Sequence, residues 1–98
     1  KPFGRGFEAP CFQGRFLVDR VSVIGKQAVH LSLQLTAGQR RYKAVWFNAL
    51  ASEGAEPPVN EGECIECAFR LQENVYQGFT QLQLLLECAY PVKEEVWA

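Results

Sequence analysis

The chain has 98 residues, of which 48% are hydrophobic, 12% aromatic and 21% charged, with a formal net charge of −1. This length supports one domain with one hydrophobic core and leaves little room for a deep substrate pocket, and the composition excludes extensive disorder. No apolar run approaches the roughly 18 residues of a membrane-spanning helix, so we expect a soluble protein with no membrane partner.

The first residues predict an extended arm. Gly4, Gly6 and Pro10 interrupt any regular element, and no apolar stretch follows Lys1, as it would in a signal peptide. We expect residues 1–15 to be an arm or linker from an upstream domain of a longer polypeptide, and residues 16–98 to be the folded domain.

Charge is distributed unevenly along the chain. Residues 1–48 carry eight basic and two acidic side chains, a net charge of +6, whereas residues 49–98 carry two basic and nine acidic side chains, a net charge of −7. If the two halves occupy different faces, one face attracts phosphates and the other repels them.

Alternation of apolar and polar residues predicts five strands. Residues 16–24 resemble a bent strand with a bulge near Asp19, and residues 27–35 place Leu31, Leu33 and Leu35 on one face. Further strands are expected over residues 40–48, 63–71 and 79–88.

Between the third and fourth strands, Asn48 is a candidate N-cap of a short helical turn that ends at Gly54. Five strands of this length bury one apolar face by closing on themselves. The predicted fold is therefore all-β, a five-stranded OB-fold-like barrel with a short helical turn between strands three and four.

Cysteine and histidine chemistry is sparse. Cys64 and Cys67 have the spacing of a metal-binding pair, but on a strand they point to opposite faces, and no second pair completes four ligands. We expect no metal site, four free cysteines and a reducing, cytoplasmic location. His30 is the only histidine, and no nucleophile with an acidic partner accompanies it, so we expect no catalytic residues.

The candidate nucleic-acid site is the basic and aromatic stretch from Arg40 to Phe47. Its cations can neutralise phosphates, and its aromatic rings can stack on bases. On a strand, Arg40, Tyr42 and Trp46 share one face, which we expect to carry His30, Ser32 and Gln34 as well. The complete set of candidate residues is Lys26, His30, Arg40, Arg41, Tyr42, Lys43 and Trp46. The alternative is that Trp46 and Phe47 are core residues and that the basic side chains keep an edge strand soluble.

Three segments resemble the OB-fold domain of the RecJ family, single-strand-specific exonucleases of the DHH phosphoesterase superfamily. They are the entering Pro2-Phe3-Gly4, the strand from Tyr42 to Asn48, and the run from Arg70 to Glu87. No Asp-His-His sequence is present, so the resemblance implies a non-catalytic module whose parent enzyme uses Mn²⁺ or Mg²⁺ in other domains.

Two functions remain open from the sequence. The first is a single-stranded-DNA-binding module of a 5′-to-3′ exonuclease of recombination and repair, whose partners are single-stranded DNA and the catalytic domains of the same polypeptide. The alternative is a structural domain that packs on the catalytic core without touching DNA. This chain itself is expected to have neither enzymatic activity nor a cofactor.

Overall fold

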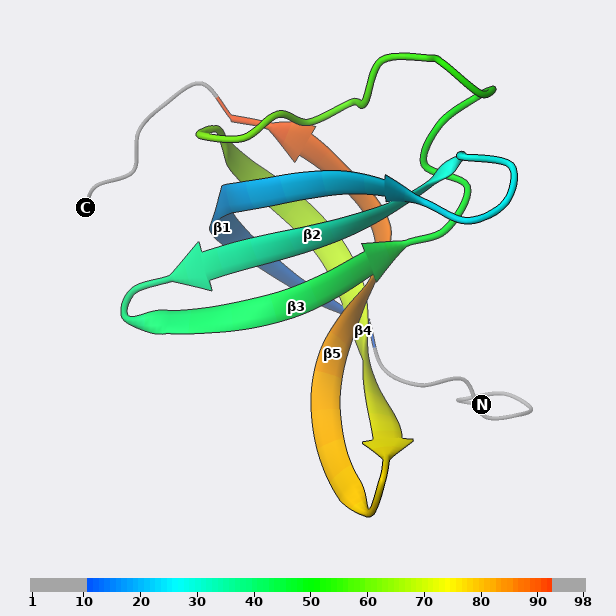
Figure 1. The fold of residues 1–98 in the computed structure, drawn as a ribbon. Helices are drawn as coiled ribbons and strands as arrows, with labels where there is room; N and C mark the ends of the chain where they lie inside the picture. Colours follow the sequence, from blue (N-terminus) through cyan, green and yellow to red (C-terminus); the bar gives the residue numbers. More distant parts are fainter. Residues whose placement is uncertain (1–10, 93–98) are drawn as a thin grey trace, which may run out of the picture.

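Five strands make up the fold in the computed structural model, which describes residues 11–92 (Figure 1). They are β1 (Phe12–Ile24), β2 (His30–Ala37), β3 (Arg40–Trp46), β4 (Cys64–Tyr76) and β5 (Phe79–Pro91). They close into a barrel in the order β1-β2-β3-β5-β4, in which only the β3–β5 pair is parallel. The expected all-β, five-stranded OB-fold-like barrel is thus confirmed. Residues 1–10 of the expected arm, which was residues 1–15, lie outside the described residues, and β1 begins within its last part, at Phe12.

The expected helical turn between the third and fourth strands is wrong. Residues 47–63 form turns and bends, and residues 11–92 contain no helix that could cross a membrane. Asn48 has a φ of 57°, which is incompatible with the extended conformation of an N-cap. The segment instead sends Leu50 and Val59 into the core, and the Leu50 amide donates to the Val29 carbonyl at 3.0 Å. A helical turn of five residues has an unfavourable nucleation free energy, and its few hydrogen bonds do not offset that cost. The irregular conformation, which buries Leu50 and Val59, is therefore favoured.

The core follows the alternation of the sequence. Leu31, Leu33 and Leu35 of β2 are at most 1% exposed, as predicted. Facing strands contribute Phe16, Val18, Ala44, Ile65, Cys67, Leu84, Leu86 and Ala89 to the same cluster. Because side chains on one face of a strand recur every second residue, this cluster fixes which residues of each strand lie outside.

The bulge predicted in the first strand is confirmed. The pairing of β1 with β2 shifts register between Val18 and Arg20. The loop before β4 satisfies the backbone here, since the Gly62 amide donates to the Val18 carbonyl at 2.8 Å and the Val18 amide donates to the Glu63 carbonyl at 2.9 Å. The extra residue reverses the phase of β1, so Arg20 and Ser22 lie on the outer face.

The β4–β5 hairpin extends beyond the barrel (Figure 1). Its turn, Gln77-Gly78, has positive φ at both residues, as a type I′ turn requires. β5 pairs with β3 at two positions only, Ala44 with Leu84 and Val45 with Leu85. Alternation over residues 63–71 and 79–88 predicts Leu71 and Leu82 on the inner face with Leu84 and Leu86. They are instead 44% and 58% exposed, because they lie in the part of the hairpin that extends beyond the barrel.

The β1–β2 turn gives a test of backbone and packing together. Gly25 has a φ of +94°, and an added Cβ would lie 2.7 Å from Cδ2 of His30. Gly25→Ala should therefore lower the free energy of unfolding in urea by about 2–3 kcal/mol, through backbone strain and a clash. Gly38→Ala is the matched control, since Gly38 has a φ of +65° with open space around it, and should cost about 1 kcal/mol. Equal losses would contradict the close packing of His30 on this turn.

Candidate nucleic-acid interface

The pairing of β2 with β3 decides which candidate residues share a face. Tyr42 lies opposite Leu35 and Trp46 lies opposite Leu31. Directly paired residues of antiparallel strands project from the same face, so both rings lie on the core side, where they pack half-buried against the hydrophobic cluster. The expectation that Arg40, Tyr42 and Trp46 share a face with His30, Ser32 and Gln34 is therefore wrong.

The physical reason is the turn between these strands. The two residues Gly38-Gln39 connect β2 to β3, so Ala37 pairs with Arg40 and every odd-numbered residue of β2 faces an even-numbered residue of β3. The alternation of β3 alone could not set this phase, because residues 44–47 are apolar on both faces. The other set of β3 residues, Arg41 and Lys43, therefore lies on the outer face.

Three strands contribute to a polar row on this outer face. Arg20 of β1 lies opposite Gln34 of β2, and Gln34 lies opposite Lys43 of β3. In the next outward-facing row, Thr36 lies opposite Arg41. The three cations are all exposed, so this part of the sheet presents positive charge and amide or hydroxyl groups side by side.

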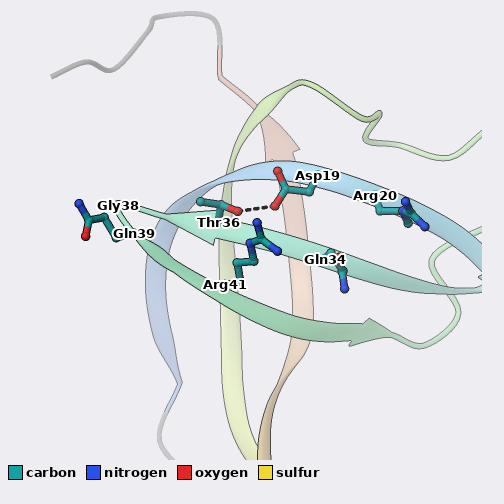
Figure 2. A pocket seen from close by; sticks show the side chains of 7 residues that line it. All are labelled: Asp19, Arg20, Gln34, Thr36, Gly38, Gln39 and Arg41. Carbon is teal, nitrogen blue, oxygen red and sulfur yellow. Dashed lines mark hydrogen bonds between the residues drawn. The ribbon is translucent and has the colours of Figure 1, made fainter.

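Two adjoining hollows lie along this row, and Arg20 and Gln34 line both of them. We call the two hollows together the basic groove. The larger has a volume of about 570 Å³. Their lining residues are Asp19, Arg20, Ser22, Ser32, Leu33, Gln34, Thr36, Gly38, Gln39, Arg41 and Lys43. Figure 2 shows the larger hollow, in which the side chains of Asp19 and Thr36 point toward each other and the Thr36 hydroxyl donates to the carboxylate. Asp19 is the acidic residue among the lining residues, and its carboxylate is thus hydrogen-bonded within the groove.

The cations of the basic groove differ in their pairing from other arginines. Arg15 forms an ion pair with Glu66 at 3.2 Å, and Arg70 forms one with Glu87 at 2.7 Å. Within residues 11–92, Arg20, Arg41 and Lys43 take part in no ion pair. Their charge is therefore available to an anionic ligand without first breaking a contact within the domain.

His30 has a structural role at the edge of this face. Its Nδ1 accepts a hydrogen bond from the Asn48 amide at 2.8 Å, and its ring meets Phe47 edge-on with centroids 5.2 Å apart. The half-buried ring thereby ties the start of β2 to the segment after β3.

Two candidate cations, Lys26 and Arg40, do not line the basic groove. Lys26 is exposed in the β1–β2 turn, and Arg40 is exposed at the start of β3, beside the hairpin turn. Sequence reasoning missed Arg20 and Ser22, although the phase change at Asp19 carried the signal. The structure brings Arg41 and Lys43 together on one face and separates them from Tyr42 and Trp46.

The described residues do not fit a divalent metal site. Within residues 11–92, no three His, Cys, Asp or Glu side chains gather where they could hold an ion. The four cysteines are free, and Cys67 is buried at 2% exposure. Burial raises the pKa of the Cys67 thiol to about 12, with Cys88 and Glu66 adding to the effect, so this thiol stays protonated and unreactive at neutral pH.

Comparison with known proteins identifies relatives over most of the chain. The sequence model of the family described as RecJ OB domain matches residues 1–88. The single-stranded-DNA-specific exonuclease RecJ of Dickeya dadantii is 26% identical over 91 residues, which are 93% of this chain and 15% of that protein. This chain therefore spans about one seventh of the length of that relative.

Solved structures share the fold. RecJ from Thermus thermophilus in complex with Mg²⁺ superposes with a TM-score of 0.62 at 16% identity, over 96% of this chain and 13% of that one. A replication protein A heterotrimer bound to single-stranded DNA superposes with a TM-score of 0.63 at 8% identity, over 91% of this chain and 62% of that one. Both likenesses show an OB-type barrel.

The Cys67 thiol predicts a pH dependence of stability. Between pH 9, near the ordinary pKa of a thiol, and pH 12, the unfolded chain loses the Cys67 proton while the folded chain keeps it. The unfolded state is favoured as pH rises, so stability should fall by at most about 1.4 kcal/mol per pH unit from this group. Urea denaturation of the wild type and of Cys67→Ala should give a steeper decline for the wild type. Parallel declines would contradict the burial of this thiol.

Proposed function

The chain belongs to the RecJ OB domain family, and on that basis we propose that it is a non-catalytic module that binds single-stranded DNA through the basic groove. The observation that carries the proposal is that Arg20 of β1 and Arg41 and Lys43 of β3 lie on one outer face, on either side of Gln34 and Thr36 of β2. All three cations are exposed and in no ion pair among residues 11–92. Lys26 and Arg40 are further exposed cations of the same three-strand region.

The chemistry of the groove suits a phosphate backbone. Guanidinium and ammonium groups neutralise successive phosphates, while the amides and hydroxyls of Gln34, Ser32 and Ser22 offer hydrogen bonds to phosphate oxygens. An extended DNA strand that crosses β1, β2 and β3 along the polar row meets Arg20 of β1, Gln34 of β2 and Lys43 of β3. Neighbouring β-strands lie about 4.8 Å apart, so the two cations are separated by two such spacings. Such contacts give affinity without base specificity.

The relatives support the nucleic-acid assignment. One similar fold belongs to a protein bound to single-stranded DNA, and the similar sequence carries the name of a single-stranded-DNA-specific exonuclease. We infer that this chain is one module of a longer RecJ-like 5′-to-3′ exonuclease that acts in recombination and repair in the cytoplasm. Catalysis and its Mn²⁺ or Mg²⁺ then belong to catalytic domains of the same polypeptide.

A second function, docking on those catalytic domains without DNA contact, is favoured by one observation. Val75 and Leu82, on one face of the β4–β5 hairpin, are 68% and 58% exposed. Neighbouring apolar side chains that are exposed on one face are typical of a surface that a protein partner covers.

Titration by NMR distinguishes the two functions. A short single-stranded oligonucleotide added at low salt to the ¹⁵N-labelled chain should shift backbone amides of β1 from Arg20 onward, of β2 and of β3. The shifts should disappear as salt rises, because counterion release drives phosphate binding. A spectrum unchanged at millimolar oligonucleotide would favour the docking function instead.

Salt dependence identifies the cations that neutralise phosphates. Arg41→Gln with Lys43→Gln should reduce the slope of log affinity against log salt by about 0.7 for each phosphate of a single strand that is no longer neutralised. Arg70→Gln, compared with Arg41→Gln alone, is the control, since it removes the same charge from a side chain that is already paired with Glu87 and lines neither hollow of the basic groove. If the control changes the slope as much as the groove variant does, the basic groove is not the binding surface.

A further inference from the structure

A second hollow, of about 550 Å³, lies beside the β2–β3 hairpin, where the β4–β5 hairpin leaves the barrel. We call it the apolar groove. Its lining residues are Phe12, Gln13, Gly14, Arg15, Phe16, Ala37, Tyr42, Phe69, Leu71, Leu82 and Leu84. None of them is acidic, and its single charged side chain is Arg15, so the groove is apolar with a cation at its rim.

Aromatic rings form a continuous series in this groove. The ring centroids of Phe12 and Phe69 are 5.8 Å apart, those of Phe69 and Phe16 are 5.7 Å apart, and those of Phe16 and Tyr42 are 5.6 Å apart. Phe16 is buried, whereas Phe12 is 43% exposed. The edge-on packing of the inner rings holds this surface rigid, and Phe12 is left with part of its ring open to solvent.

The two grooves lie on either side of the β2–β3 hairpin. Ala37 and Tyr42 line the apolar groove, while Gly38, Gln39 and Arg41 line the basic groove. Because Arg41 and Tyr42 are consecutive residues of β3, one points outward and the other points to the inner side. A ligand that crosses the hairpin thus meets a cation on one side and rings on the other.

We propose that the apolar groove holds bases of the same nucleic-acid strand whose phosphates lie in the basic groove, an inference that rests on the proposed function. A single strand has this division of chemistry along its length, since each nucleotide joins a charged phosphate to a flat aromatic base. Stacking on Phe12 lets any base occupy the groove, because every base has a π-face. Positive charge at Arg41 in the adjoining basic groove and the lack of acidic side chains in the lining of the apolar groove favour this occupant over a basic peptide.

The apolar groove should favour a ligand that carries bases, but it should discriminate little between the four base types. Among its lining side chains, those with hydrogen-bonding groups are Gln13, Arg15 and Tyr42, too few to read the edges of several bases. The affinity it adds should therefore depend on the presence of bases rather than on their order.

An abasic ligand tests the proposal. Affinity of the 98-residue chain should be measured by fluorescence anisotropy for oligo(dT) and for an oligonucleotide of equal length with the same phosphates but abasic sugars. Phe12→Leu, which keeps an apolar side chain but removes the ring, should weaken oligo(dT) binding about tenfold, as expected for the loss of one stacked base. It should leave binding of the abasic ligand unchanged, and Phe12→Tyr should retain the wild-type affinity for both.

Phe79→Leu is the matched control, because Phe79 is 71% exposed on the β4–β5 hairpin but does not line the groove. Circular dichroism and urea denaturation confirm that each variant is folded. Equal affinity of the wild type for both ligands, or an unchanged oligo(dT) affinity in Phe12→Leu, would overturn the base-stacking groove while the proposed function stands. Failure of the folded wild type to bind either ligand at low salt would overturn the proposed function and this inference with it.

Discussion

The register between β2 and β3 is the constraint on which both grooves depend. A turn of two residues pairs Ala37 with Arg40, and the leucines of β2 then require Tyr42, Ala44 and Trp46 to face the interior. A shift of one residue would bury Arg41 and Lys43 and expose the rings, at the cost of placing charges in the core. Core burial on one face of β3 therefore determines the charge on the other.

Barrel closure between β3 and β5 shapes the second groove. These strands pair at only two positions, and β5 then continues with β4 as an extended hairpin. Apolar side chains of the hairpin, such as Leu71 and Leu82, lie past the enclosed core and form a wall beside Phe12 and Tyr42. A longer β3–β5 ladder would occupy this space with backbone, so limited pairing creates an apolar surface beside a basic one.

The net charge of −1 conceals a division of roles among the charged groups. Glu66 and Glu87 pair with Arg15 and Arg70, and the carboxylate of Glu61 accepts a hydrogen bond from the Val21 amide at 3.0 Å. These acidic groups support the barrel, while the outer cations of β1–β3 remain exposed. Attraction for a polyanion then depends on the local field of the groove rather than on total charge.

Local pattern in the sequence determined the five strands, the leucine face of β2, the bulge near Asp19 and the likeness to the RecJ OB domain, because alternation and turn residues act over short distances. The tertiary structure decided three further features. Leu50 and Val59 were drawn into the core, which left no helical turn after β3. Cross-strand register placed Tyr42 on the core side and Arg41 on the outer face, and the bulge brought Arg20 into line with Gln34 and Lys43. Each depends on contacts between residues distant in sequence, which the periodicity of a single strand does not contain.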